Sequence, residues 1–212
     1  MVTISLEQIS IEPGERLVLR DVTWPRFEAI LQALGDDRNT RIAYHDEVLE
    51  IMAPLPEHEI NKESLSDLVK ILLEALEIDY IALGSTTLKK LKKQAGVEPD
   101  SCFYIQHCVM MQGKLNIDLN SDPPPDLAIE IDLTSKTKLD AYIATAVPEV
   151  WRYEQGQLTI YRFVDGAYLP APSQILPSWL PPSRLVEFSQ LMQTGSRLSA
   201  IRAFRSFIQA AH

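Results

Sequence analysis

Residues 126–133 alternate acidic or small side chains with large apolar ones, without a break. Because successive side chains of a β-strand point to opposite faces, one face of this strand is apolar and the other carries three carboxylates. The apolar face consists of Leu127, Ile129, Ile131 and Leu133, and the acidic face of Asp126, Ala128, Glu130 and Asp132. Side chains two residues apart on one face lie roughly 6.5 to 7 Å apart, so the carboxylates repel one another. The fold must supply a core on one side of the strand and a compensating environment on the other.

Two environments could compensate for the acidic face, and the strand alone does not choose between them. An edge strand could leave its carboxylates in water, where their charge also discourages aggregation. Another arrangement would direct them at a hard divalent cation, for which carboxylate oxygens are preferred ligands.

The remaining pattern predicts helices before, between and after several strands. Apolar residues at helical spacing are clearest over residues 57–76, which we expect to form a long amphipathic helix. Further helices are expected at about 24–34, 138–146 and 183–192 and from 198 onward. Strands are expected at 41–44, 48–52, 80–88, 100–105, 127–133, 150–153 and 158–163. The proline-rich stretch 170–182 should wrap irregularly over the core, and its alternative is a linker. This order predicts an α/β or α+β fold in which helices flank a mixed sheet.

Length and composition favour one globular domain over residues 1–212. The chain is 46% hydrophobic and has only 8 glycines and 14 prolines, which excludes the collagen-like and disordered classes. The longest uncharged stretch, residues 166–183, contains five prolines, so no membrane-spanning helix is expected. The acidic N-terminal residues do not resemble a signal peptide. We therefore expect a cytoplasmic protein that does not enter a membrane, with Cys102 and Cys108 as reduced thiols.

Charge is distributed unevenly along the chain. Residues 46–79 contain ten acidic residues against two lysines, and the whole chain has a net charge of −9. A basic cluster follows, formed by Lys89, Lys90, Lys92 and Lys93. This cluster is a candidate nucleic-acid-binding surface, and its alternative is an ordinary solvated strand end.

Carboxylates are the residues left for chemistry, because the familiar motifs of other enzymes are missing. The sequence has no glycine-rich phosphate loop, no G-x-S-x-G, no H-E-x-x-H and no zinc spacing of cysteine and histidine. It does have Pro99-Asp100 at the head of an expected strand. Together with Glu130-x-Asp132, this pair of motifs matches the metal site of the restriction-endonuclease-like superfamily, whose pattern is Pro-Asp, a gap, then Asp/Glu-x-Lys.

Further segments make a family resemblance closer. They are GSTTLKK at 84–90, EPDSCFYI at 98–105, PPPDLAIEIDLTS at 123–135 and VPEVWRYEQGQLTIYR at 147–162, with Glu57-His58 opening the long helix. In this order they resemble the Uma-type putative endonucleases, a bacterial group long described as a domain of unknown function. The resemblance covers about residues 23–205.

The resemblance implies a restriction-endonuclease-like fold with a nuclease core at about residues 40–165, on which the N-terminal helix and hairpin and the C-terminal helices pack. Within that core, Asp100 and Glu130 would bind Mg²⁺ or Mn²⁺ for the hydrolysis of DNA phosphodiester bonds. Asp132 would be an additional or supporting group. The first long helix would contribute Glu57, His58 or Glu59, and helical phase favours His58 because it directs that side chain toward the core. The alternative for His58 is a local hydrogen bond at the start of the helix.

One position departs from the superfamily pattern. Asp132 stands where the motif has its lysine, so the lysine must come from elsewhere. Lys138 and Lys136 are nearest in sequence, and Lys89 and Lys90 are the other source.

This departure leaves a second function open, which is a nuclease-like interaction or regulatory module that does not cut. A third is hydrolysis of a smaller phosphate ester. A homodimer is suggested only by analogy with enzymes that cut two strands. Mutual repulsion also leads us to expect that Asp100→Asn or Glu130→Gln stabilises the metal-free protein or leaves its stability unchanged.

Overall fold

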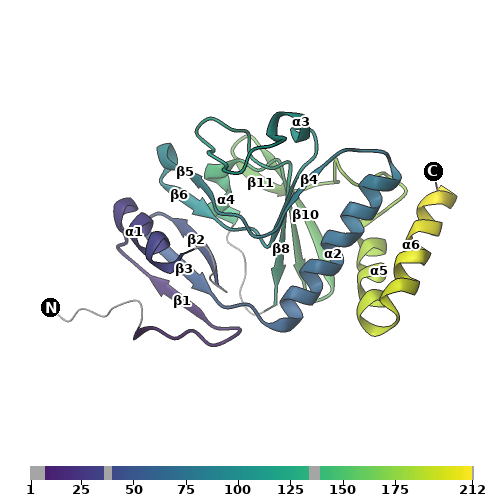
Figure 1. Cartoon of the computed structure of the whole chain (residues 1–212), viewed down its shortest axis with the longest axis horizontal. Helices are drawn as coiled ribbons and strands as arrows, with labels where there is room; N and C mark the ends of the chain where they lie inside the picture. The colour runs from purple at the N-terminus through teal and green to yellow at the C-terminus, as the bar shows by residue number, and fades with distance from the viewer. Residues whose placement is uncertain (1–7, 36–39, 134–138, 212) are drawn as a thin grey trace.

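The computed structural model describes residues 8–35, 40–133 and 139–211, which form two sheets and six α-helices (Figure 1). The helices are α1 (Trp24–Leu34), α2 (Pro56–Ala75), α3 (Cys108–Met111), α4 (Leu139–Thr145), α5 (Pro182–Thr194) and α6 (Arg197–Ala211). The mixed α+β architecture that the sequence predicts is confirmed.

The larger sheet has six strands in the order β11-β10-β9-β8-β7-β4. Their bounds are β4 (Ile81–Leu83), β7 (Ser101–Tyr104), β8 (Leu127–Asp132), β9 (Glu149–Glu154), β10 (Gln157–Val164) and β11 (Ala167–Pro170). Only β8 and β9 pair in parallel, because α4 crosses over between them, and the other neighbours are antiparallel. The sheet is therefore mixed, as expected.

Helices α2 and α5 cover one face of this sheet, and α6 packs against both of these helices on the outside (Figure 1). The apolar stripe of α2 and the odd-numbered residues of β8 meet there, so the apolar face of the alternating strand lies in the main core. The segment between β11 and α5 is irregular and packs on the same core, with Leu180 buried and Trp179 against Phe207. The predicted wrap is thus present.

The smaller sheet has five strands in the order β1-β3-β2-β6-β5. Their bounds are β1 (Arg16–Leu19), β2 (Arg41–His45), β3 (Val48–Met52), β5 (Leu88–Lys90) and β6 (Ala95–Val97). Helix α1 covers one face through a cluster that includes Trp24, Phe27 and Tyr44. The β2–β3 turn holds Asp46 and Glu47 at positive φ, which matches the tight hairpin predicted there.

Strand β8 is central in the larger sheet and is not an edge strand. All six of its residues are buried, and its even-numbered face is covered by α4 and by residues of the smaller sheet. The interpretation in which the acidic face lies in water is therefore wrong. Glu130 and Asp132 need partners inside the protein.

Sequence periodicity also failed where strands are very short. The single strand expected at 80–88 is two strands, β4 and β5, which belong to different sheets. Three-residue strands have too few residues for alternation to be recognised, so β6 was not predicted either.

Cys102 and Cys108 are both free thiols. No helix in the described part of the chain combines the length and apolar character that crossing a bilayer requires.

Candidate active site

Strand register places two carboxylates and a guanidinium in one row across the larger sheet. Ser101 lies opposite Ile129 in the antiparallel β7–β8 pair, so Asp100, one residue earlier, lies beside Glu130. In the parallel β8–β9 pair, Glu130 lies opposite Arg152. The Pro-Asp motif and the Glu-x-Asp motif, 30 residues apart in sequence, are thus adjacent in space.

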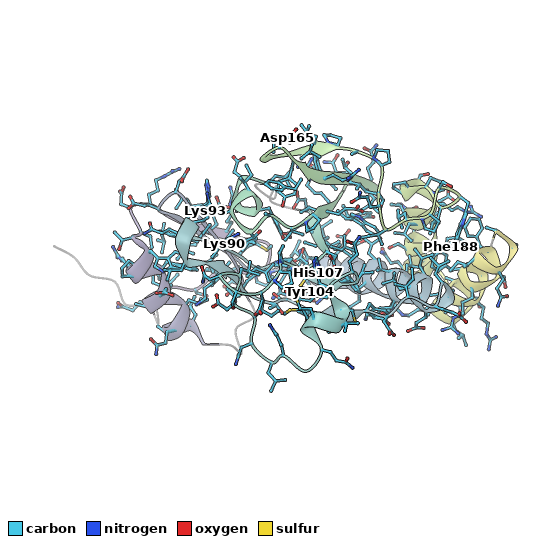
Figure 2. All side chains as sticks on the ribbon, turned by 90° about the horizontal axis from the view of Figure 1, so that it is seen from above. Lys90, Lys93, Tyr104, His107, Asp165 and Phe188 are labelled. Carbon is cyan, nitrogen blue, oxygen red and sulfur yellow. The ribbon has the colours of Figure 1, made fainter. Side chains whose placement is uncertain are left out.

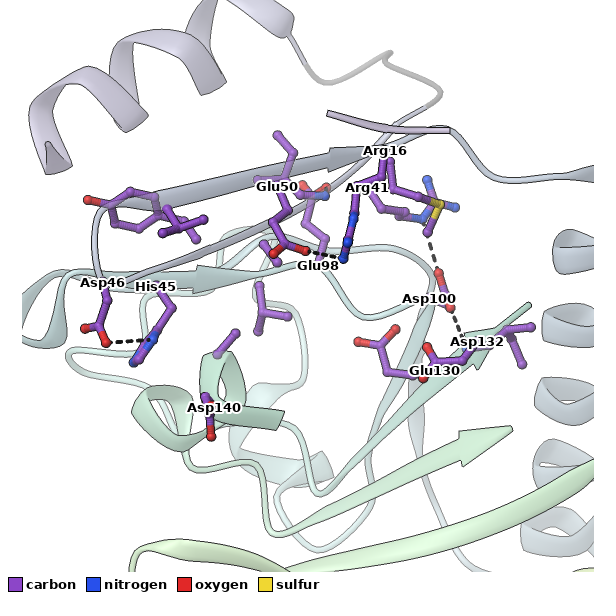
Figure 3. Close-up of a pocket in the computed structure, with 18 residues that line it drawn as sticks. Arg16, Arg41, His45, Asp46, Glu50, Glu98, Asp100, Glu130, Asp132 and Asp140 are labelled. Atoms are coloured by element: carbon purple, nitrogen blue, oxygen red, sulfur yellow. Dashed lines mark hydrogen bonds and ion pairs between the residues drawn. The ribbon is translucent and has the colours of Figure 1, made fainter. Parts of the chain in front are cut away.

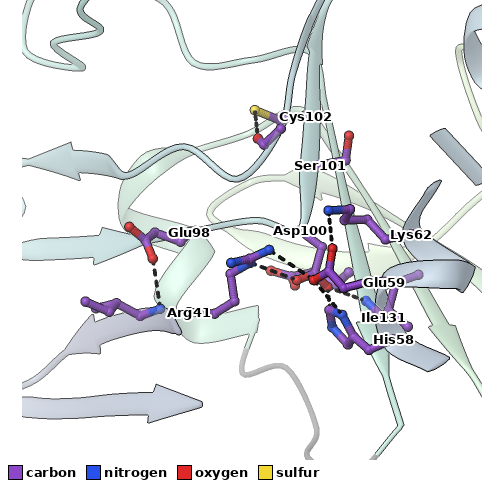
Figure 4. A network of polar contacts seen from close by, with 12 residues as sticks. Arg41, His58, Glu59, Lys62, Glu98, Asp100, Ser101, Cys102 and Ile131 are labelled. Atoms are coloured by element: carbon purple, nitrogen blue, oxygen red, sulfur yellow. Dashed lines mark hydrogen bonds and ion pairs between the residues drawn. The ribbon is translucent and has the colours of Figure 1, made fainter. Parts of the chain in front are cut away.

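Asp100 is held by donors from three parts of the chain, as Figure 4 shows. Its Oδ2 accepts a hydrogen bond from the backbone N–H of Ile131 at 2.8 Å and lies 3.0 Å from His58 Nε2. Its Oδ1 lies 3.6 Å from Arg41 Nε, which comes from the smaller sheet. The side chain is only 2% exposed, so this charge is buried but compensated.

Glu130 is in the opposite situation, because the charged group beside it is a second acid, Asp100. Burial raises the pKa of Glu130 well above its usual value, and the negative charges of Asp100 and Asp132 raise it further. A hydrogen bond from the Tyr142 hydroxyl of α4 acts against this increase. The carboxyl groups of Glu130 and Asp100 are close enough to share a hydrogen bond. Glu130 thus keeps its proton at a pH where an exposed glutamate has lost it.

His58 lies in the first turn of α2 and points inward, as its helical phase predicts. It is 3% exposed, and within the described residues neither ring nitrogen makes a well-aligned hydrogen bond, although Asp100 is close. Its neighbour Glu59 is paired with Lys62, and Glu59 Oε1 lies 3.2 Å from Arg41 Nη2. This buried imidazole is therefore placed between Asp100 and Glu59, where it can orient the Asp100 carboxylate.

Asp132, at the position where the superfamily motif has lysine, faces a cation from the next strand. Arg152 Nε lies 3.7 Å from Asp132 Oδ2, and the guanidinium also lies over the ring of Tyr161, 5.0 Å from its centroid. A positive charge is therefore present near this position, but it comes from β9 and is paired with the aspartate.

The structure does not bring every candidate residue to this cluster. Asp126, the first residue of the acidic face, is held at the other end of β8 by His107 and by backbone N–H groups. Lys136 and Lys138 lie outside the described residues, so their role stays a prediction.

The basic cluster lies on the smaller sheet. Lys89 Nζ is 3.8 Å from Glu28 of α1, and the side chain of Lys92 is outside the description. Figure 2 shows Lys90 and Lys93 at the end of the molecule opposite Phe188 and the C-terminal helices. Its use for nucleic acid remains a prediction.

A cavity of about 210 Å³ opens beside the carboxylates, between the two sheets and α4 (Figure 3). Asp100, Glu130 and Asp132 line one side, Arg41 and residues of β2 and β3 line another, and α4 contributes Asp140 and Ala141. The candidate site is therefore accessible to a ligand from this cavity.

The donor set suits a hard divalent cation. Mg²⁺ is commonly bound by one or two carboxylates, with waters and substrate oxygens completing its coordination. Asp100 and Glu130 supply two such carboxylates, and the charge of Asp100 that helps to raise the pKa of Glu130 also makes a positive charge between them favourable. Within the described residues, no three His, Cys, Asp or Glu side chains converge as a closed metal cage. The residues thus fit an open site and do not fit a fully protein-enclosed one.

Comparison with protein families agrees with this arrangement. A family model described as Uma2, putative restriction endonuclease, matches residues 24–194, which is most of the chain. The chain belongs to the Uma2 family. The resemblance expected from the sequence motifs is confirmed, and the Uma2 match includes Asp100, Glu130 and His58.

A solved structure shares the fold of this Uma2 protein. It is described as a putative nuclease belonging to DUF820 from Anabaena variabilis ATCC 29413, is 12% identical, and superimposes with a TM-score of 0.50. The match covers 87% of this chain and 99% of that one. No curated protein sequence matches the chain. The similarity extends over almost all of the neighbour and establishes a nuclease-like fold.

Three residues of the site were not predicted from the sequence. They are Arg41, Tyr142 and Arg152. Each reaches the carboxylates from a different element, and their contacts depend on strand order and helix placement, which local patterns do not contain. The only signal was that Arg152 belongs to a motif of the family resemblance.

Proposed function

We propose that this Uma2 protein is an endonuclease that hydrolyses DNA phosphodiester bonds with Mg²⁺ or Mn²⁺. The observation that carries the proposal is the Asp100–Glu130 pair, buried side by side and open to a cavity. Two like charges held together by a fold are unfavourable unless a proton or a cation lies between them. Groups with a pKa perturbed by both burial and a specific charge occur preferentially at functional sites.

The roles of the individual residues follow from their positions. Asp100 and Glu130 would hold the cation, with the backbone carbonyl of Ile131 as a further oxygen ligand. When bound, the cation would lower the pKa of a water molecule and stabilise negative charge on the phosphate. His58, 3.0 Å from Asp100, would orient that carboxylate or hold a proton. The hydrogen bond from Tyr142 would keep Glu130 in position.

The proposed hydrolysis also needs an activating lysine. We propose Lys138, with Lys136, Lys89 and Lys90 as alternatives, because Asp132 occupies the usual position. Replacing the active lysine by methionine should lower turnover by ~100-fold or more, the usual scale for one lost electrostatic contact, without unfolding the protein. The matched control is Lys114→Met, whose lysine pairs with Asp122 in a loop. If all four variants cut like wild type, no lysine has this role.

A second candidate function is a nuclease-like module that binds but does not cut. The Asp132–Arg152 ion pair favours it, because an aspartate and a paired arginine replace the free lysine of the motif. The net charge of −9 also makes strong binding of a polyanion less favourable.

The experiment that separates the two functions is incubation with supercoiled plasmid and with circular single-stranded DNA. Purified wild type, Glu130→Gln and an exposed-carboxylate control, Glu63→Gln, are compared in Mg²⁺, in Mn²⁺ and in chelator. The endonuclease proposal predicts nicking by wild type and Glu63→Gln that is lost in Glu130→Gln and in chelator. Intact DNA in every lane, with all three proteins folded, would select the module instead.

A further inference from the structure

Asp100 lies in the short connection between the two sheets. Strand β6 of the smaller sheet ends at Val97 and strand β7 of the larger sheet begins at Ser101, so residues 98–100 join the sheets. Asp100 is therefore outside both strands. The direction of its carboxylate depends on the side chains and backbone groups that the connection contacts.

On the side of the smaller sheet, strand β2 holds this connection. The backbone N–H of Glu98 donates to the carbonyl oxygen of Ile42 at 2.9 Å, and the N–H of Ile42 donates to Glu98 Oε2 at 3.1 Å. The buried Glu98 carboxylate also accepts a hydrogen bond from the Thr87 hydroxyl. These bonds fix β2 next to the connection, and they place Arg41, the residue before Ile42, beside Asp100.

Arg41 bridges Asp100 to helix α2 (Figure 4). Its Nε lies 3.6 Å from Asp100 Oδ1, and its Nη2 donates to Glu59 Oε1 at 3.2 Å. The first distance exceeds that of a hydrogen bond, so Arg41 attracts Oδ1 without occupying its lone pairs. His58 contacts the same two acids, since its Nε2 is 3.0 Å from Asp100 Oδ2 and its Nδ1 is 3.6 Å from Glu59 Oε1. The two oxygens of Asp100 are thus attracted in different directions, which fixes the plane of the carboxylate.

A second arginine lines the same cavity and has different contacts. Arg16 of β1 pairs with Glu50 of β3 at 3.1 Å, within the smaller sheet. Its side chain is 38% exposed, whereas that of Arg41 is 15% exposed. Arg16 therefore provides a matched control for the removal of a positive charge from this cavity.

We propose that Arg41 is a positioning residue of the candidate site, which fixes the Asp100 carboxylate for the cation by bridging it to Glu59. This inference rests on the proposed function, because it concerns the cation of the same site. An arginine that acted through its charge alone would repel the cation and weaken metal binding. A partner that orients a metal ligand strengthens binding instead, typically by roughly 10- to 100-fold. The two roles therefore predict opposite effects when Arg41 is replaced.

Calorimetric titration with Mn²⁺ compares wild type with Arg41→Met, Arg41→Lys and the control Arg16→Met. Arg41→Met should bind Mn²⁺ about tenfold or more weakly, and Arg16→Met should bind it like wild type. Arg41→Lys should not restore the affinity, because lysine keeps the charge but lacks the planar guanidinium that reaches two carboxylates. Should Arg41→Met not fold, Arg41→Lys carries the same test.

Glu59 should act through Arg41, and a double-mutant comparison tests this. Glu59→Gln should weaken Mn²⁺ binding in the wild-type background and add little to the loss in the Arg41→Met background. Equal losses in both backgrounds would mean that Glu59 acts through its own charge, which would contradict the bridge.

A further measurement needs no metal. Urea denaturation in chelator compares wild type, Arg41→Met, Asp100→Asn and the double variant. The effect of Arg41→Met on the unfolding equilibrium constant should be smaller by about fivefold or more in the Asp100→Asn background, because the two residues interact directly. Arg16→Met should have the same effect in both backgrounds.

The outcomes distinguish this inference from the proposed function. Wild-type or tighter Mn²⁺ binding in folded Arg41→Met, full affinity in Arg41→Lys, or no coupling with Asp100→Asn would overturn the positioning role. If wild type nevertheless nicks plasmid, the endonuclease proposal stands without it. If the predicted losses are found but wild type cuts no DNA, the positioning role stands and the endonuclease proposal fails. Absence of Mn²⁺ binding by wild type would overturn both.

Discussion

At the residue scale, the two central acids are compensated by different means. Asp100 accepts from the Ile131 N–H and lies near His58 and Arg41, so its negative charge has partners. Glu130 is buried beside Asp100, and its raised pKa lets it keep its proton, which avoids a second buried negative charge. The sequence identified both residues by motif, but it treated them as equivalent. Their difference depends on which donors the fold places around each one.

For Glu130, the metal-free protein should lose stability as pH rises. Its pKa is raised in the folded state, so below the unfolded value of about 4.3 both states carry the proton and the folded form has its full stability. Above that value the unfolded chain releases the proton and the folded one does not, so the free energy of unfolding falls until pH passes the folded pKa. Glu130→Gln should therefore gain stability relative to wild type between acidic and neutral pH. Urea titrations of both proteins in chelator at several pH values measure this difference in the free energy of unfolding. A difference that stays constant with pH, or that favours wild type as pH rises, contradicts the raised pKa.

For Asp100, the contacts change what mutual repulsion alone predicts. Asp100→Asn relieves repulsion, but it replaces one carboxylate oxygen with an NH2 group, which donates hydrogen bonds and cannot accept them, and it weakens the attraction to Arg41. We expect a loss of about 1–3 kcal/mol in the free energy of unfolding, the usual effect of breaking a buried hydrogen bond to a charged group. The measurement is again chemical denaturation in chelator. An Asp100→Asn protein as stable as Glu130→Gln would show that these contacts matter less than repulsion.

At the scale of elements, long regular segments were predictable and short ones were not. Helix α2 and strand β8 have periodic apolar residues over their whole length, and both formed where expected, with His58 and Glu130 facing inward. Strands β5 and β6 have three residues each, and the pairing of β6 with β2 joins residues distant in sequence. Local patterns predicted β2 and β3 as strands, but not that these strands line a cavity beside the carboxylates.

Helix α4 contributes to the site through its buried Tyr142, whose hydroxyl donates a hydrogen bond to Glu130. Tyr142→Phe removes the hydroxyl that donates this hydrogen bond and keeps the aromatic ring in the core. The free energy of unfolding should drop by about 1–2 kcal/mol, and the pKa of Glu130 should rise further because a hydrogen bond that lowers it is lost. Denaturation curves of wild type and Tyr142→Phe at low and neutral pH test this.

The matched control for that variant is Tyr168→Phe, whose hydroxyl donates to backbone carbonyls on the same helix and its following loop. Tyr168→Phe should lower the free energy of unfolding by a similar amount, and the pH dependence of that free energy should stay as in wild type. If both variants show the same pH profile, Tyr142 is a packing residue only.

At the scale of the whole molecule, the order of motifs was enough to predict the family and the nuclease-like fold, both of which are confirmed. The placement of the smaller sheet against the larger one was not predictable, because Arg41 and His45 carry no motif and reach the cavity only through tertiary packing. The proposed chemistry therefore comes from the motif residues, and the cavity beside them is lined in part by residues that carry no motif.

The central claim is that Asp100 and Glu130 form a site where a cation takes the place of a proton. Calorimetric titration of the metal-free protein with Mn²⁺, repeated in buffers of different ionisation enthalpy, measures affinity and proton release together. We predict binding that tightens as pH rises, with release of a proton, and an affinity lower by about tenfold or more in Glu130→Gln but unchanged in Glu63→Gln. Absence of binding at millimolar Mn²⁺, or equal affinity in Glu130→Gln, would contradict the claim.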